Sequence, residues 1–206
     1  MKSIFFINVL LLLIFNVSQA QIEVTNLDDS GTGSLRQAIT DAHSLSGLTT
    51  ITFNLSLDGT ITLLSNLPTI TSPLVIIGNG VGKTIIDGNN AFKIFEIDRS
   101  SLNVSNMTMH NMSSGSRGSA LYSKRSQVVA DNIKLYDYKS TSIFSENEST
   151  VKVINSIIEN GSAYVFSSDW GSTPVSSDEE QFNNRIYFIN TTCLLYTSPS
   201  PRDKRQ

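Results

Sequence analysis

The sequence predicts an all-β protein built as a parallel β-helix, a solenoid of stacked coils, with one capping helix near its N-terminus. Three observations predict this fold. Short apolar stretches recur at a constant interval, asparagines recur beside them, and only 16% of the 206 residues are charged, against about 25% in an average soluble domain. Ser, Thr and Asn take the place of the missing charges, which argues against a coiled coil and favours short strands joined by polar turns.

The composition also narrows the functional classes. The formal net charge is −3 and no stretch is rich in Lys or Arg, which argues against a nucleic-acid partner. A single Cys and two His exclude a disulfide scaffold and a Cys/His metal cluster. We therefore expect no nucleic-acid partner, no metal and no cofactor.

Residues 1–20 are typical of a secretory signal peptide. The second residue is lysine, the stretch 4–17 is mainly apolar, and Ser18 and Ala20 occupy the −3 and −1 positions of a small-residue cleavage site. The apolar run is shorter than the ~20 residues that a transmembrane helix needs. We expect a secreted protein, extracellular or at the cell surface, with no membrane span in this fragment and a mature chain that begins at Gln21.

One helix is expected after residue 34. Ser34 and Gln37 form a capping-box pattern, in which the serine accepts a hydrogen bond from the first turn and the glutamine reaches back to the serine N–H. The apolar residues recur at helical spacing and are Leu35, Ala38, Ile39 and Ala42. An amphipathic helix here would cover the edge of the first coil, so we expect it to act as a cap.

The rest of the N-terminal half contains five short runs with the composition of strands. They are rich in β-branched and aromatic residues and are separated by glycines. The expected strands are 51–53, 60–63, 74–77, 84–86 and 94–97. Their spacing is irregular, as is common in terminal coils of repeat proteins.

The middle of the chain repeats at a constant interval. Leu121, Ile143 and Val165 are equally spaced, and each begins a motif of an apolar residue, an aromatic residue and a serine. Side chains alternate between the two faces of a strand, so we expect these three residues to stack inward as one ladder and the aromatic residues to face outward. With the alternation inverted, the rings would form the core instead. The aromatic residues are Tyr122, Phe144 and Phe166.

Asparagines mark a second repeat. They follow strand-like stretches at Asn106, Asn132, Asn155 and Asn190. A further polar residue follows five positions after the first three, at Asn111, Asp137 and Asn160. Asparagine tolerates the left-handed backbone conformation and hydrogen-bonds locally. We expect the first set to be structural corners with inward-pointing side chains that bond to one another along the solenoid.

The final segment, 193–206, shows no periodicity. Residues 193–203 can be back-translated into a transposase-type sequencing-library adaptor; the alternative is a natural Pro/Ser linker. We expect residues 193–206 to be a non-native scar without regular packing, and residues 21–192 to be the β-helix. The natural protein is then expected to continue further, so that this β-helix is C-terminally truncated.

Several segments resemble a known superfamily. VTNLDDSGTGSLRQAITDA (24–42), ITFNLSLDGTITLLSNLPTI and LVIIGNGVGKTIIDG resemble the N-terminal region of secreted right-handed parallel β-helix proteins of the pectin-lyase-like superfamily. GSALYS and INSIIENG resemble repeats of polymorphic outer-membrane proteins and related adhesin-like chains. The resemblance implies a right-handed coil. It does not imply one function, because the superfamily includes lyases, glycosidases and adhesins.

No catalytic constellation is recognisable in the sequence. Glycoside hydrolysis needs two carboxylates at a controlled separation, and the only adjacent pair, Asp28 and Asp29, lies before the helix, where a turn is expected. We therefore expect a secreted or cell-surface scaffold of the adhesin type, with a polysaccharide or a matrix glycan as its partner. The alternative is a carbohydrate-active enzyme, a polysaccharide lyase or glycoside hydrolase, whose catalytic residues lie in missing C-terminal coils.

Aromatic side chains are the candidates for glycan contact, because their faces stack on sugars. The candidates are Tyr122, Phe144, Phe166 and Trp170. The alternative is that the rings pack between coils and that the acidic loop 168–184, which contains Trp170, is merely solvated. Asn-X-Ser/Thr motifs would permit N-glycosylation in a eukaryotic secretory pathway. The candidate sites are Asn54, Asn103, Asn111, Asn147 and Asn160.

Overall fold

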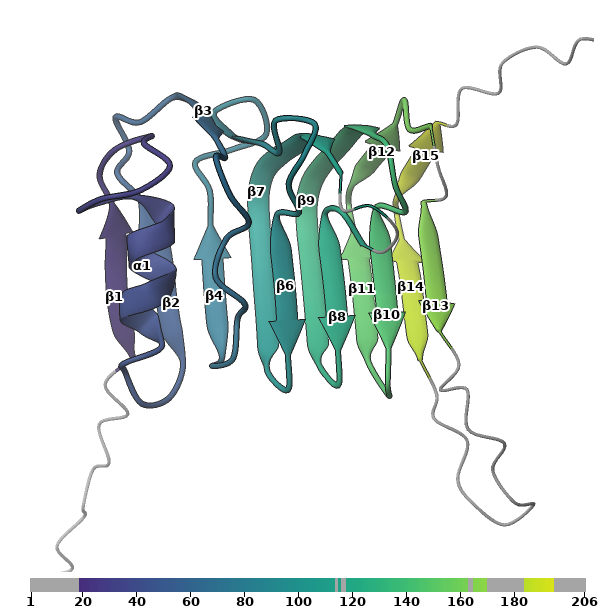
Figure 1. The fold of residues 1–206 in the computed structure, drawn as a ribbon, viewed down its shortest axis with the longest axis horizontal. Coiled ribbons are helices and arrows are strands. Elements are labelled where there is room, and N and C mark those ends of the chain that lie inside the picture. The colour runs from purple at the N-terminus through teal and green to yellow at the C-terminus, as the bar shows by residue number, and fades with distance from the viewer. Residues whose placement is uncertain (1–18, 114, 116–117, 163–164, 170–183, 195–206) are drawn as a thin grey trace, which may run out of the picture.

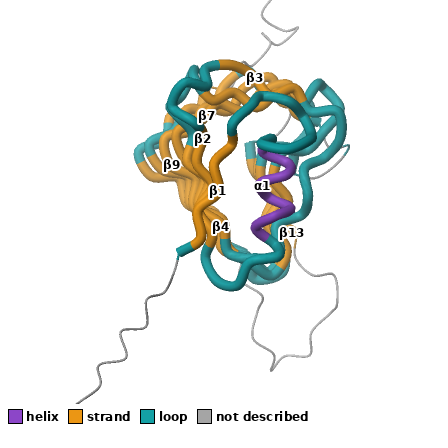
Figure 2. The backbone as a smooth tube through the Cα atoms, turned by 90° about the vertical axis from the view of Figure 1, so that its left-hand side faces the viewer, coloured by secondary structure: helices purple, strands orange, loops and turns teal. Residues whose placement is uncertain are grey.

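The computed structural model describes residues 19–113, 115, 118–162, 165–169 and 184–194. These residues form a parallel β-solenoid of about six turns, which confirms the predicted all-β fold. Figure 1 shows the strands of successive coils standing side by side, and Figure 2 shows the coils stacked behind one another around a common interior.

The strands form three faces along the solenoid. The first face runs in the order β1 (Ala20–Val24), β2 (Thr49–Phe53), β4 (Leu74–Ile77), β7 (Ser101–Met112), β9 (Gln127–Tyr138), β11 (Thr150–Ile154) and β14 (Arg185–Ile189). The second face holds β3 (Gly59–Thr62), β5 (Thr84–Asp87), the second halves of β7 and β9, β12 (Ile157–Glu159) and β15 (Thr192–Leu194). The third face holds β6 (Phe95–Asp98), β8 (Leu121–Lys124), β10 (Ile143–Glu146) and β13 (Phe166–Asp169). The long strands β7 and β9 bend from the first face into the second and join them into one 11-stranded sheet.

The helix α1 (Leu35–Ala42) forms where the sequence predicts it, with its four apolar residues buried. Ser34 is the N-cap, and its Oγ accepts a hydrogen bond from the Gln37 N–H at 3.2 Å. The other predicted hydrogen bond, from the Ser34 N–H to the Gln37 side chain, is wrong. The Gln37 Nε2 instead donates to the Asp41 Oδ1 at 2.6 Å. In the first coil, α1 lies on the side that the third face occupies in later coils (Figure 2). Its action as a cap stays a prediction.

The predicted inward ladder is confirmed for two members and wrong for the third. Leu121 and Ile143 are in register and fully buried. Their partners on either side are Phe95 and Phe166, so the register places Phe166, and not Val165, in the ladder. Phe166 is therefore not part of an outward aromatic row.

The slip of one residue has a local cause. In β6, β8 and β10, the residue before the strand and the first residue of the strand are both buried, so the inside–outside alternation fails at this point. Val165, which precedes β13, is buried too. In the described part of the chain β13 pairs with β10 alone, which leaves the Phe166 side chain 55% exposed. Its ring packs against the inward Phe188 of β14 at 5.7 Å between centroids.

The four asparagines predicted as corners lie at bends of the chain, and their side chains do not point inward. All four residues have a left-handed backbone, with φ between 48° and 57°; they are Asn106, Asn132, Asn155 and Asn190. Three of the four are exposed and Asn106 is half-buried. The Asn132 Nδ2 donates to the Asn106 Oδ1 at 2.8 Å, and the Asn190 Nδ2 donates to the Asn155 Oδ1 at 2.8 Å. The Asn155 Nδ2 donates to the Asp131 Oδ1 instead, so the ladder is interrupted once.

A second corner ends the second face. Asn111, Asp137 and Asn160 have φ of 50°, 52° and 50°, and the Asn160 Nδ2 donates a hydrogen bond to the Asp137 Oδ1. The five positions that separate the two corners leave room for one short strand. This explains why the polar residues recur at that distance in three coils.

The C-terminal part departs from one expectation. Cys193 and Leu194 belong to β15, which pairs in parallel register with β12, so these two residues do have regular packing. Residues 195–206 lie outside the described residues. Within the described part of the chain, no helix is long and apolar enough to cross a membrane.

The histidine that ends α1 predicts a pH dependence of stability. The Nε2 of His43 is buried and has no hydrogen-bond partner, and burial lowers the pKa of this imidazole below its ordinary value of 6.5. The unfolded chain therefore binds more protons than the folded chain once the pH falls below about 6.5, and stability falls with it.

We expect the melting temperature of the protein to fall between pH 7.5 and pH 5 by more than that of a His43→Gln variant, in which this group cannot titrate. Thermal unfolding followed by circular dichroism across that range measures the difference. Parallel pH curves for the two proteins would contradict the prediction.

Candidate functional site

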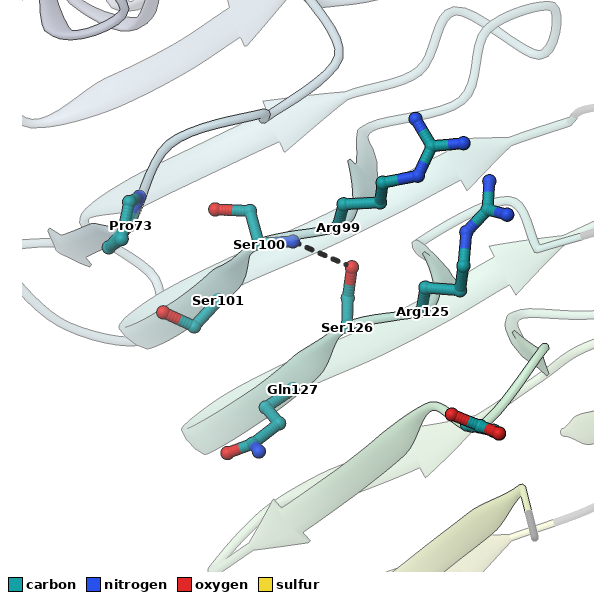
Figure 3. A pocket seen from close by; sticks show the side chains of 8 residues that line it. Pro73, Arg99, Ser100, Ser101, Arg125, Ser126 and Gln127 are labelled. Carbon is teal, nitrogen blue, oxygen red and sulfur yellow. Dashed lines mark hydrogen bonds between the residues drawn. The ribbon is translucent and has the colours of Figure 1, made fainter. Parts of the chain in front are cut away.

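A surface cavity of about 510 Å³ lies at the corner where the chain passes from the third face to the first. Figure 3 shows it from close by. Its lining comes from the same turn in successive coils and comprises Pro73, Arg99, Ser100, Ser101, Arg125, Ser126, Gln127 and Glu148. Charged and hydroxyl side chains dominate this lining, so the cavity suits a polar ligand.

Two arginines define the cavity. Arg99 follows the last residue of β6, and Arg125 follows the last residue of β8. Both have a left-handed backbone, with φ of 51° and 48°, so the same turn presents both side chains. The two guanidinium groups extend side by side in the same direction (Figure 3). Neighbouring parallel strands are about 4.8 Å apart, which sets the step from one arginine to the next.

The two arginines are incompletely neutralised. Asp98 contacts both, with 3.8 Å from its Oδ2 to the Arg99 Nη1 and 3.5 Å from its Oδ1 to the Arg125 Nη2. These separations exceed those of a charge-assisted hydrogen bond. The side chains of Arg99 and Arg125 are 67% and 41% exposed. One carboxylate thus serves two guanidinium groups, which leaves donors available to an incoming anion.

A row of serines holds the turn in place. The Ser100 N–H donates to the Ser126 Oγ at 3.1 Å (Figure 3), and the Ser126 N–H donates to the Ser149 Oγ at 3.1 Å. The Ser126 hydroxyl in turn donates to the Lys124 carbonyl oxygen at 2.6 Å. Ser126 and Ser149 therefore each link their coil to the preceding one at this turn, immediately after Arg125 and Glu148 respectively.

The chemistry of the lining suits the binding of an anion. Guanidinium groups present planar, fixed donors that match carboxylate and sulfate oxygens. Glu148 is the one carboxylate among the eight lining residues, and the Asp98 carboxylate contacts both arginines. Glu148 belongs to the next coil and limits the cationic part of the cavity on that side.

The predicted aromatic row differs from what the structure places on the third face. Tyr122 and Phe144 are in register and their rings meet edge to face at 5.7 Å between centroids. The Phe144 side chain is only 5% exposed, so it is a packing residue and not an open surface for a sugar. Tyr122 is half-buried, and the Lys93 Nζ lies 4.3 Å from its ring centroid. The Phe144 ring is therefore not the accessible surface that the expected glycan contact requires.

The remaining predicted site residues are scattered. Trp170 lies outside the described residues, as does the loop 170–183. Of the five candidate glycosylation sites, Asn103 on the first face and Asn160 at the second corner are exposed. The other three, Asn54, Asn111 and Asn147, are half-buried. Their modification stays a prediction.

Sequence analysis missed Arg99 and Arg125, although a signal was present. The sequence reads Asp-Arg-Ser-Ser at 98–101 and Lys-Arg-Ser-Gln at 124–127. The two arginines are therefore separated by the same interval as Asn106 and Asn132. A search for repeated charged pairs at the coil length would have placed both arginines at one corner.

The described residues contain no group of three or more His, Cys, Asp or Glu side chains that could hold a metal ion. No model of a known protein family matches the chain, and no curated protein matches it.

Proposed function

We propose that the protein is a secreted or cell-surface β-solenoid scaffold of the adhesin type that binds an acidic glycan at the Arg99–Arg125 corner. The observation that supports this most is the pair of guanidinium groups one coil apart, which project in parallel at one cavity and share one carboxylate, that of Asp98. Two arginines at a fixed step suit a polymer that repeats its negative charge.

The proposal of a secreted protein rests on the sequence. Residues 1–20 have the composition of a signal peptide, and the segments from Val24 onwards resemble right-handed pectin-lyase-like β-helices. We propose on these grounds that the coil is right-handed, that the chain is exported, and that residues 193–206 are an adaptor-derived scar. The parallel solenoid of about six turns supports the comparison with parallel β-helices.

The test is the affinity for acidic polysaccharides. We expect the protein to bind polygalacturonate or a sulfated glycan in isothermal titration calorimetry at low salt, and to lose affinity as salt screens the charges. Hydrogen bonds to charged groups contribute about 1.5–3 kcal/mol each, so Arg99→Ala or Arg125→Ala should weaken binding about tenfold or more. Glu148→Gln should strengthen binding, because it removes a negative charge from the cavity edge.

Lys83→Ala is the matched control. Lys83 is exposed, lies in the turn before β5 and does not line the cavity, yet its removal changes the net charge by the same amount. An equal loss of affinity in Lys83→Ala and in the arginine variants would show that net charge alone sets the affinity. This result would contradict a specific site.

The same incubation tests the alternative of a carbohydrate-active enzyme. Release of reducing or unsaturated ends from the polysaccharide would replace the scaffold proposal with that alternative. Retention of polymer length together with arginine-dependent binding would support the scaffold.

A further inference from the structure

A row of four polar side chains crosses the outer surface of the second face. The register aligns Asp87 of β5, His110 of β7, Tyr136 of β9 and Glu159 of β12, one residue from each coil. All four are half-buried, and each alternates with buried residues of its strand. We call these four residues the second-face row. It lies away from the arginine corner, which joins the third face to the first.

The two central rings of the row are fixed by each other. His110 and Tyr136 stack with 4.8 Å between ring centroids and 8° between ring planes. Within the described residues, neither the imidazole nitrogens nor the Tyr136 hydroxyl makes a hydrogen bond. The stack therefore orders both rings through their faces and leaves their polar atoms, at the ring edges, available to a ligand.

The flanks of the row are carboxylates. The Lys134 Nζ lies 2.6 Å from the Glu159 Oε1 and 5.2 Å from the Tyr136 ring centroid. One ammonium group therefore contacts both the Glu159 carboxylate and the Tyr136 ring. At the other end, the Asp87 Oδ1 accepts a hydrogen bond from the Asn89 N–H at 2.7 Å. This bond orients the Asp87 carboxylate, whose second oxygen can accept another bond.

The spacing along the row indicates binding. Asp87 and Glu159 are three coil steps apart, which is about 14 Å at the usual spacing of strands. This exceeds the separation of about 5–9.5 Å between the two carboxyl groups of glycoside hydrolases. The row instead offers acceptors at its ends and mixed donors and acceptors at its centre, at a regular step.

We propose that the second-face row is a binding site for a neutral oligosaccharide that lies along the solenoid axis. The hydroxyls of such a chain donate to the Asp87 and Glu159 carboxylates and exchange hydrogen bonds with the His110 and Tyr136 edges. Two carboxylates with one balancing lysine disfavour an acidic glycan here, in contrast to the arginine corner. The proposal does not depend on the function proposed for that corner.

The test uses a variant that lacks the imidazole nitrogens of His110 and the hydroxyl of Tyr136 but keeps two aromatic rings that can stack. Saturation-transfer NMR and titration of the whole chain with cello-, xylo- and manno-oligosaccharides give the dissociation constants. We expect at least one of the three to bind, and the double variant His110→Phe/Tyr136→Phe to weaken that binding about thirtyfold, because it loses the hydrogen bonds of two side chains to the ligand. Thr60→Ala on the same face is the matched surface control, and it should bind as the unaltered protein does.

The outcomes separate the two sites. Arg99→Ala/Arg125→Ala should leave the neutral oligosaccharide bound with unchanged affinity, whatever it does to acidic polymers. Absence of binding for all three oligosaccharides would overturn the proposal. Unchanged affinity in the His110→Phe/Tyr136→Phe variant, with its circular dichroism spectrum preserved, would overturn it too.

Discussion

Replacing Ile143 with Asp is expected to unfold the middle coils. Ile143 is fully buried on β10 and is stacked between Leu121 and Phe166 in the inward ladder. Truncating a buried isoleucine costs about 2–5 kcal/mol. Placing a carboxylate in the same apolar space adds the cost of desolvating a charge. Because whole domains are stable by only about 5–15 kcal/mol, the combined loss should remove most of the folded population.

The measurement is urea denaturation followed by far-ultraviolet circular dichroism, with Ile157→Asp as the matched control. Ile157 lies on β12, its side chain is 41% exposed, and its register partner is Lys134. The same substitution there meets solvent and a neighbouring cation, so stability should change little. Similar midpoints for the two variants would show that Ile143 does not face the interior.

Replacing Asn132 with Val is expected to destabilise the solenoid by about 2–3 kcal/mol. Asn132 has φ of 51°, and a left-handed backbone costs an ordinary L-residue about 1–2 kcal/mol, with a β-branched residue among the worst suited. The substitution also removes the hydrogen bond from Asn132 Nδ2 to the Asn106 Oδ1, which contributes about 1 kcal/mol. Denaturation midpoints measure the sum.

Asn132→Gly separates the two contributions. Glycine adopts the left-handed conformation without a steric penalty and lacks the amide, so it should lose about 1 kcal/mol, the part due to the hydrogen bond. If the valine and glycine variants were equally stable, the corner would not impose its backbone conformation on residue 132.

Much of the fold could be predicted because the solenoid repeats a local pattern. The helix at 35–42, the five N-terminal strands and the corner asparagines each depend on residues close together in the chain, and all of them formed. The register between neighbouring coils was harder to predict. Val165 and Phe166 differ by one position, and a slip of one residue moves a side chain to the other face. The motif recurs at equal intervals, whereas the coil that pairs Ile143 with Phe166 is one residue longer than the coil that pairs Leu121 with Ile143.

The site was less predictable than the fold. Aromatic rings suit sugars, yet the Phe144 side chain is only 5% exposed, and Phe166 is in register with the buried Ile143 and packs against Phe188. The arginine corner depends on the turns after β6 and β8, where Arg99 and Arg125 adopt a backbone conformation that propensity does not favour. The stacking of His110 on Tyr136 depends on the pairing of β7 with β9, which the interval between two unlike residues does not reveal.

The pairing of each coil with its neighbours alone makes the molecule extensible. Gln127 is in register with Thr150, and Leu102 is in register with Val128, so contacts across the long direction span one coil length and no more. A second copy of residues 127–149 inserted after Ser149 would meet matching strands above and below, and its Asn132 equivalent would extend the polar ladder of the corner. Growth or shortening by whole coils therefore leaves the remaining interfaces unchanged, as in a one-dimensional lattice. For a polymer-binding surface, this means that reach along the ligand could evolve by duplicating one coil without redesigning the core.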